Sequence, residues 1–88
     1  MFRCEVEEYI KKNIIGAKIK WHWAECESDK EGRNYEWYDI EHPTLNLKLC
    51  IIFFNNPNKI YGFFVEDVDN KIIILKKGLL GKYKYETL

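Results

Sequence analysis

Two histidines and three cysteines are the side chains of this sequence best suited to metal binding or nucleophilic chemistry. His22, Cys26, His42 and Cys50 could act together as zinc ligands if neighbouring strands brought them close. The chain has no Cys-x-x-Cys and no His-x-x-x-His pair, so we expect no metal site. Burial as small apolar side chains is the simpler interpretation of Cys4, on a helix face, and of Cys50, in an apolar strand.

Few other residues of the chain could take part in catalysis. Ser28 is the only serine, and no glycine-framed turn surrounds it. The segment 78–82 ends in Gly-Lys but lacks the spacing of a phosphate-binding loop and the Ser or Thr that follows it. We therefore predict no catalytic residues, no cofactor and no enzymatic activity.

The segment 25–41 combines acidic side chains with aromatic rings. Seven acids stand against two bases in it, Lys30 and Arg33. The side chains that could contact a partner are Glu27, Asp29, Glu31, Tyr35, Glu36, Trp37, Asp39 and Glu41. Complementary charge speeds protein association, and Trp and Tyr are common anchors in interfaces. The pattern favours a protein-binding module, of the inhibitor or immunity type, that engages a basic partner; the competing interpretation is a solvated hairpin with Trp37 in the core.

A second candidate surface suggests a different function, the binding of nucleic acid or a nucleotide-like ligand. It would use lysines near the C-terminus for phosphate and tryptophans for stacking: Lys76, Lys77, Lys82, Lys84, Trp21 and Trp23. Alternation would place lysines and tyrosines of this segment on opposite faces, and lysines also protect edge strands from pairing. Trp21 and Trp23 share their parity with Ile19, which favours packing beneath a helix. The neutral net charge makes nucleic acid the weaker candidate partner.

Charge, cysteine content and hydropathy restrict the setting in which the chain works. Residues 1–42 carry seven basic and ten acidic side chains, whereas residues 43–88 carry seven and four. Three widely spaced cysteines are typical of a reducing compartment, and the N-terminal residues do not resemble a signal peptide. No apolar run approaches the roughly 20 residues of a membrane-spanning helix. We expect a cytoplasmic protein without a membrane partner, and the Ile, Lys, Asn and Tyr content suggests a bacterial or phage source.

The elements that must position these residues follow from the period of the apolar side chains. Residues 2–15 repeat every three or four positions and predict an amphipathic helix, after which Gly16 would end it. Alternation with period two predicts strands over about 17–27, 34–41, 44–54, 59–66 and 71–77. A further strand over 82–87 stays open, and the segment 55–58 is a dense turn signal.

The expected fold is α+β, a single domain over residues 1–88. An N-terminal helix would pack on a five- or six-stranded antiparallel sheet, because the short turns leave no room for parallel crossovers. Strong curling could close the same strands into a small barrel, which periodicity does not distinguish from an open sheet. If Ile72–Leu75 lies at a sheet edge, it could pair with a second copy of the chain and form a homodimer.

Overall fold

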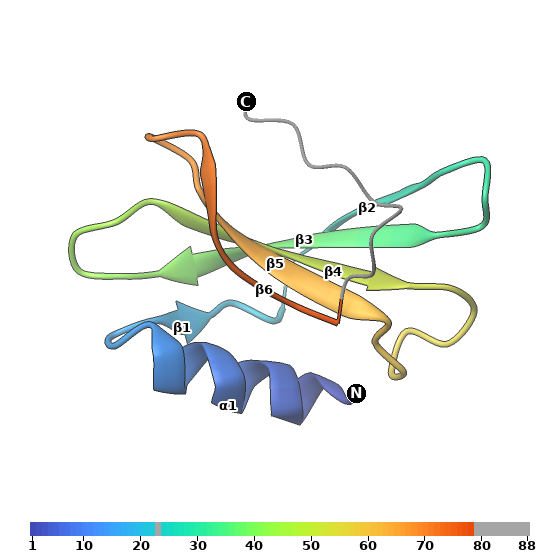
Figure 1. The fold of residues 1–88 in the computed structure, drawn as a ribbon, viewed down its shortest axis with the longest axis horizontal. Helices are drawn as coiled ribbons and strands as arrows, with labels where there is room; N and C mark the ends of the chain where they lie inside the picture. The colour runs from blue at the N-terminus through green and yellow to red at the C-terminus, as the bar shows by residue number, and fades with distance from the viewer. Residues whose placement is uncertain (23, 79–88) are drawn as a thin grey trace.

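A computed structural model of the chain describes residues 1–22 and 24–78. The elements are α1 (Arg3–Asn13), β1 (Lys18–Ile19), β2 (Glu25–Ser28), β3 (Asn34–Glu41), β4 (Leu47–Phe53), β5 (Gly62–Asp67) and β6 (Ile72–Lys77). They form one antiparallel sheet with α1 packed against one of its faces (Figure 1). The α+β prediction is confirmed, and the sheet is open rather than closed into a barrel. The proposed strand over 82–87 lies outside the described residues.

The sheet has the order β1-β3-β4-β5-β6, and β2 also pairs with β3. β1 and β2 therefore share one edge of β3: Lys18 lies opposite Glu41, and Glu25 lies opposite Trp37. The prediction of one continuous strand over 17–27 is wrong, because the chain turns at residues 21–22 between the two pairings. At this turn the indole of Trp21 lies between the helix and the sheet: it donates a hydrogen bond to Glu7 of α1 and packs against Tyr38 of β3.

The helix begins and ends close to its predicted limits. The Glu5 carboxylate accepts a hydrogen bond of 3.0 Å from the Phe2 backbone N–H, which satisfies a donor at the start of α1. Val6 and Ile10 are fully buried and point from α1 toward the sheet. Beyond the helix, Gly16 adopts a φ of +87°, a conformation that glycine reaches without strain.

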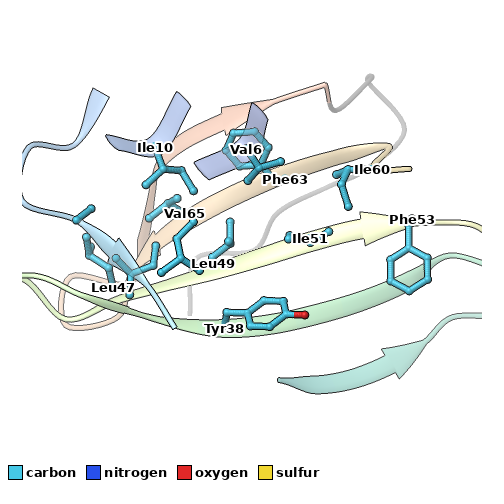
Figure 2. Close-up of a cluster of buried hydrophobic side chains, with 13 residues drawn as sticks. Val6, Ile10, Tyr38, Leu47, Leu49, Ile51, Phe53, Ile60, Phe63 and Val65 are labelled. Carbon is cyan, nitrogen blue, oxygen red and sulfur yellow. The ribbon is translucent and has the colours of Figure 1, made fainter. Parts of the chain in front are cut away.

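The main core lies between α1 and the sheet. Alternate residues of β4 supply its floor, and residues of β3 and β5 complete it. Figure 2 shows its labelled members: Val6, Ile10, Tyr38, Leu47, Leu49, Ile51, Phe53, Ile60, Phe63 and Val65. The opposite face of the sheet carries a smaller buried cluster of Tyr35, Cys50, Ile52 and Phe64. β4 is thus buried on both faces, as predicted from its continuous apolar second half.

Candidate functional site

The acidic residues of the β2–β3 hairpin divide into three groups. Side chains alternate across a strand, which gives one group on each face, and the third group lies in the loop between the strands. The register places Glu25 opposite Trp37 and Glu27 opposite Tyr35, so these four side chains share one face of the hairpin. Asp39 and Glu41 follow on the same face by parity, which is the face away from α1. We call the side chains of Glu25, Glu27, Trp37, Asp39 and Glu41 the acidic face.

Trp37 lies at the centre of the acidic face and is half-buried. Its ring packs edge-on against Phe64, with ring centroids 5.4 Å apart and an interplanar angle of 82°. The indole Nε1–H donates a hydrogen bond of 3.1 Å to Glu27 Oε1. These two contacts fix the orientation of the ring while part of its surface stays open to solvent, as is typical of an interface anchor.

The carboxylates of the acidic face are exposed and form no ion pair with any residue that the structure describes. Lysines are nearby: Lys18 lies opposite Glu41 on β1, and Lys48 lies opposite Asp39 on β4. Lys48 also lies opposite Glu66, whose pKa is raised by burial. Lys76, opposite Phe64, also lies on this side of the sheet, so three lysines lie near the four carboxylates of the acidic face, which remains net negative (3 − 4 = −1).

Glu36 lies on the other face of β3, beneath the start of α1. Its carboxylate forms an ion pair with the Arg3 guanidinium and accepts a hydrogen bond of 3.2 Å from the Tyr38 hydroxyl. Arg3 donates a second hydrogen bond of 3.0 Å to the same hydroxyl and lies 5.5 Å from the Trp21 ring. Glu36 thus attaches α1 to the sheet, and the structure separates it from the acidic face.

Asp29 and Glu31 belong to the loop between β2 and β3, where they form contacts within the loop. Asp29 accepts hydrogen bonds of 2.9 Å from the backbone N–H groups of Glu31 and Arg33, and 2.7 Å from the Tyr35 hydroxyl. Arg33 forms ion pairs with both carboxylates. The Tyr35 hydroxyl and the Arg33 donors hold the pKa of Asp29 well below its usual range. Because Tyr35 is buried, its hydrogen bond to Asp29 connects the loop to the folded sheet, and Asp29 and Glu31 stabilise the loop conformation.

The lowered pKa of Asp29 predicts acid sensitivity for the domain. A carboxylate whose pKa falls on folding stabilises the folded state above its unfolded pKa of about 3.9, and this stabilisation is lost as the pH falls toward the folded value. Asp29→Asn should therefore have a lower free energy of unfolding than the wild type at pH 7, and the difference between the two proteins should become smaller below about pH 4. Urea unfolding at pH 7 and pH 3 checks this; an unchanged difference would contradict it.

The second candidate surface does not converge among the described residues. Trp21 donates a hydrogen bond of 2.7 Å from Nε1 to Glu7 and packs edge-on against Tyr38, on the side of α1. Lys77 Nζ lies 4.3 Å from the centre of the Tyr9 ring on that same side, whereas Lys76 lies opposite Phe64 on the other face. Trp23, Lys82 and Lys84 lie outside the described residues.

His42 supports two turns. Its Nδ1 accepts hydrogen bonds of 3.2 Å and 3.1 Å from the backbone N–H groups of Thr44 and Leu45. A ring nitrogen that accepts carries no proton, so Nε2 is the donor to the Ile15 carbonyl at 3.0 Å. Over residues 1–22 and 24–78, no group of three or more His, Cys, Asp and Glu side chains could hold a metal ion.

The three cysteines are free thiols with different exposure. Cys50 is fully buried in β4, and burial raises its pKa, which agrees with its interpretation as a small apolar side chain. The same interpretation is wrong for Cys4, which is exposed. Position 4 lies on the helix surface turned away from Val6 and Ile10, the two buried positions of α1.

A hollow at the β4–β5 connection is a feature that the sequence analysis did not identify. It has a volume of about 430 Å³ and is lined by Phe54, Asn55, Asn56, Lys59, Ile60 and Tyr61. The segment 55–58 was interpreted only as a turn. The available signal was the pair of aromatic residues, Phe54 and Tyr61, at the two ends of this connection.

Comparison with known proteins gives no relative for this chain: no family model, no curated protein and no solved structure matches it. The described helix α1 is too short and too polar to cross a membrane.

Proposed function

We propose that this chain is a small non-enzymatic module that binds a protein with a basic surface, in the manner of an inhibitor or immunity protein. The observation that supports this proposal is the acidic face: exposed carboxylates without an ion pair in the described chain surround a half-buried tryptophan. A cytoplasmic setting agrees with the three free thiols.

The arrangement suits an arginine- or lysine-rich partner. A guanidinium can stack on the open side of the Trp37 ring while Glu25 or Asp39 accepts its hydrogen bonds. The packing of Trp37 against Phe64 and its bond to Glu27 limit the rotamer entropy that binding would cost. Charge on the surrounding carboxylates would speed encounter with such a partner and make association sensitive to salt.

Charge reversal on the acidic face tests the proposal. Glu25→Lys with Asp39→Lys should weaken partner capture from a bacterial lysate by at least tenfold, because both carboxylates that flank Trp37 become repulsive. The matched control is Glu8→Lys with Asp69→Lys, which makes the same change in net charge at exposed positions outside the acidic face. Quantitative mass spectrometry of the captured proteins, with circular dichroism of each variant, gives the readout.

Capture should survive in the control and should weaken for the wild type as the salt concentration rises. Equal capture by both double variants would remove the acidic face from the mechanism. Capture that is insensitive to salt, or that selects acidic proteins, would also contradict the proposal.

A further inference from the structure

The hollow at the β4–β5 connection has the dimensions of a small-molecule site. Its volume of about 430 Å³ lies within the roughly 300 to 1,000 Å³ of most ligand pockets. Two aromatic rings form part of its wall: Phe54 and Tyr61 meet edge-on, with centroids 5.1 Å apart and an interplanar angle of 79°. Phe54 is 43% exposed, a large apolar surface to leave in water beside a cavity.

The polar groups around the hollow favour an anionic ligand. Lys59 supplies a cation, and none of the lining residues carries a carboxylate. Among the described residues, the Lys59 amine, the Asn55 carboxamide and the Tyr61 hydroxyl form no hydrogen bond. Asn56 uses its Oδ1 to accept from the Asn58 backbone N–H at 2.9 Å, which leaves its amide hydrogens as donors.

The backbone around the hollow is held in place by hydrogen bonds on both sides. The Lys59 N–H donates to the Asn56 carbonyl at 3.0 Å, and the Tyr61 N–H donates to the Ile52 carbonyl at 2.8 Å. Ile60 is buried, and its N–H donates to the Met1 carbonyl at 2.7 Å. These bonds fix the turn before any ligand arrives, which lowers the cost of binding.

We propose that this hollow binds a nucleobase that carries a phosphate group, either as a free nucleotide or within a single strand. The base stacks on the exposed Phe54 ring, since every nucleobase offers a flat face to an aromatic side chain, and it meets the Tyr61 ring, which lies at 79° to Phe54, edge-on. The carboxamides of Asn55 and Asn56 hydrogen-bond to the base edge. Lys59 pairs with the phosphate. The site goes beyond the protein-binding function and shares no residue with the acidic face.

Titration of the ¹⁵N-labelled chain with AMP, GMP, CMP and UMP, followed by NMR, tests this proposal. At least one nucleotide should give saturable shifts concentrated in residues 54–61, with a Kd below about 1 mM. The nucleoside of the tightest-binding nucleotide and ribose 5-phosphate each lack one recognised group and should bind at least about tenfold more weakly than that nucleotide. A single-stranded tetranucleotide distinguishes the sources: tighter binding than the mononucleotides indicates a strand, and equal or weaker binding indicates a free nucleotide.

Two variants and one control complete the experiment. Lys59→Ala should weaken nucleotide binding about tenfold, the loss of one charge-assisted bond, and Phe54→Ala should do the same through lost stacking. Lys12→Ala removes an exposed lysine of α1 and should leave the Kd unchanged. The proposal is wrong if no nucleotide produces saturable shifts, if the shifts lie outside residues 54–61, or if Lys59→Ala binds as tightly as Lys12→Ala.

Discussion

Phe63→Ala should lower the free energy of unfolding by about 3–5 kcal/mol, as observed for large aromatic residues removed from protein cores. Phe63 is the second residue of β5 and is fully buried in the main core (Figure 2). Its ring meets the ring of Tyr9 of α1 edge-on, with centroids 5.8 Å apart. Alanine would remove this contact and leave a cavity between the helix and the sheet. Domains of this size are stable by only about 5–15 kcal/mol, so the variant would lose a large fraction of its free energy of unfolding. Urea denaturation monitored by circular dichroism measures it.

Phe54→Ala is the matched control for this prediction. The same change of residue at a 43% exposed position should cost less than about 1 kcal/mol, because much of the ring is already in water. Phe54→Ala should also weaken nucleotide binding about tenfold while it costs little stability. Equal destabilisation by the two substitutions would contradict the placement of Phe63 at the centre of the core.

Glu36→Lys should destabilise the domain by about 2–3 kcal/mol. The side chains of Glu36 and Arg3 are 17% and 26% exposed, so their ion pair lies between a surface pair, worth up to about 1 kcal/mol, and a buried pair, whose disruption costs about 3–5 kcal/mol. Reversal replaces an attraction with a repulsion and leaves the Tyr38 hydroxyl without its acceptor. The helix α1 should loosen from the sheet first, since Arg3 is its opening residue.

Two comparisons separate this prediction from a general effect of charge. Glu41→Lys makes the same change at an exposed position of the same strand and should cost at most about 1 kcal/mol. Exchange of the pair, Arg3→Glu with Glu36→Arg, should recover part of the lost stability. Thermal unfolding with hydrogen exchange of the α1 amides provides the readout. Equal stability of Glu36→Lys and Glu41→Lys would contradict a role of the Arg3–Glu36 ion pair in holding α1 against the sheet.

The central part of the fold was predictable because its side-chain pattern is set by two independent constraints. β3 occupies the predicted limits 34–41, where alternation and flanking turns agree. β4 was identified as the middle of the sheet because Cys50 and Ile52 add a second apolar face to the alternating residues around them. Strand order beyond these hairpins follows from short connections, and the structure has β3, β4, β5 and β6 as consecutive neighbours.

The break between β1 and β2 was not predictable from periodicity. Lys18, Lys20 and His22 alternate with apolar residues as they would in a strand, so the local pattern continues through the turn. At the turn, the Trp21 indole donates a hydrogen bond to Glu7 of α1, which lies 14 residues away in the sequence. Alternation is a local pattern and carries no information about such tertiary contacts.

The acidic segment shows a similar division between local and distant information. Glu36 was grouped with the other carboxylates as a partner-contacting residue, although alternation along the strand puts it on the opposite face from Trp37 and Asp39. Its partner Arg3 is 33 residues away, and only the packing of α1 on the sheet reveals the ion pair. Asp29 accepts hydrogen bonds from the backbone N–H groups of Glu31 and Arg33. These bonds depend on the backbone conformation of the turn, which several sequences could form, so composition alone does not predict this role of Asp29.

The interrupted edge beside β3 affects how copies of this chain can stack. Intermolecular strand addition needs a continuous row of free backbone donors and acceptors, whereas β1 spans two residues, β2 spans four, and the chain turns away between them. Among the described strands, β6 forms the other edge of the sheet and is longer than β1 or β2, and it carries Lys76 and Lys77 at one end. Strand addition to β6 would bring these lysines of two copies together, so we expect amyloid-type aggregation through this edge to be slow at low ionic strength and faster in high salt.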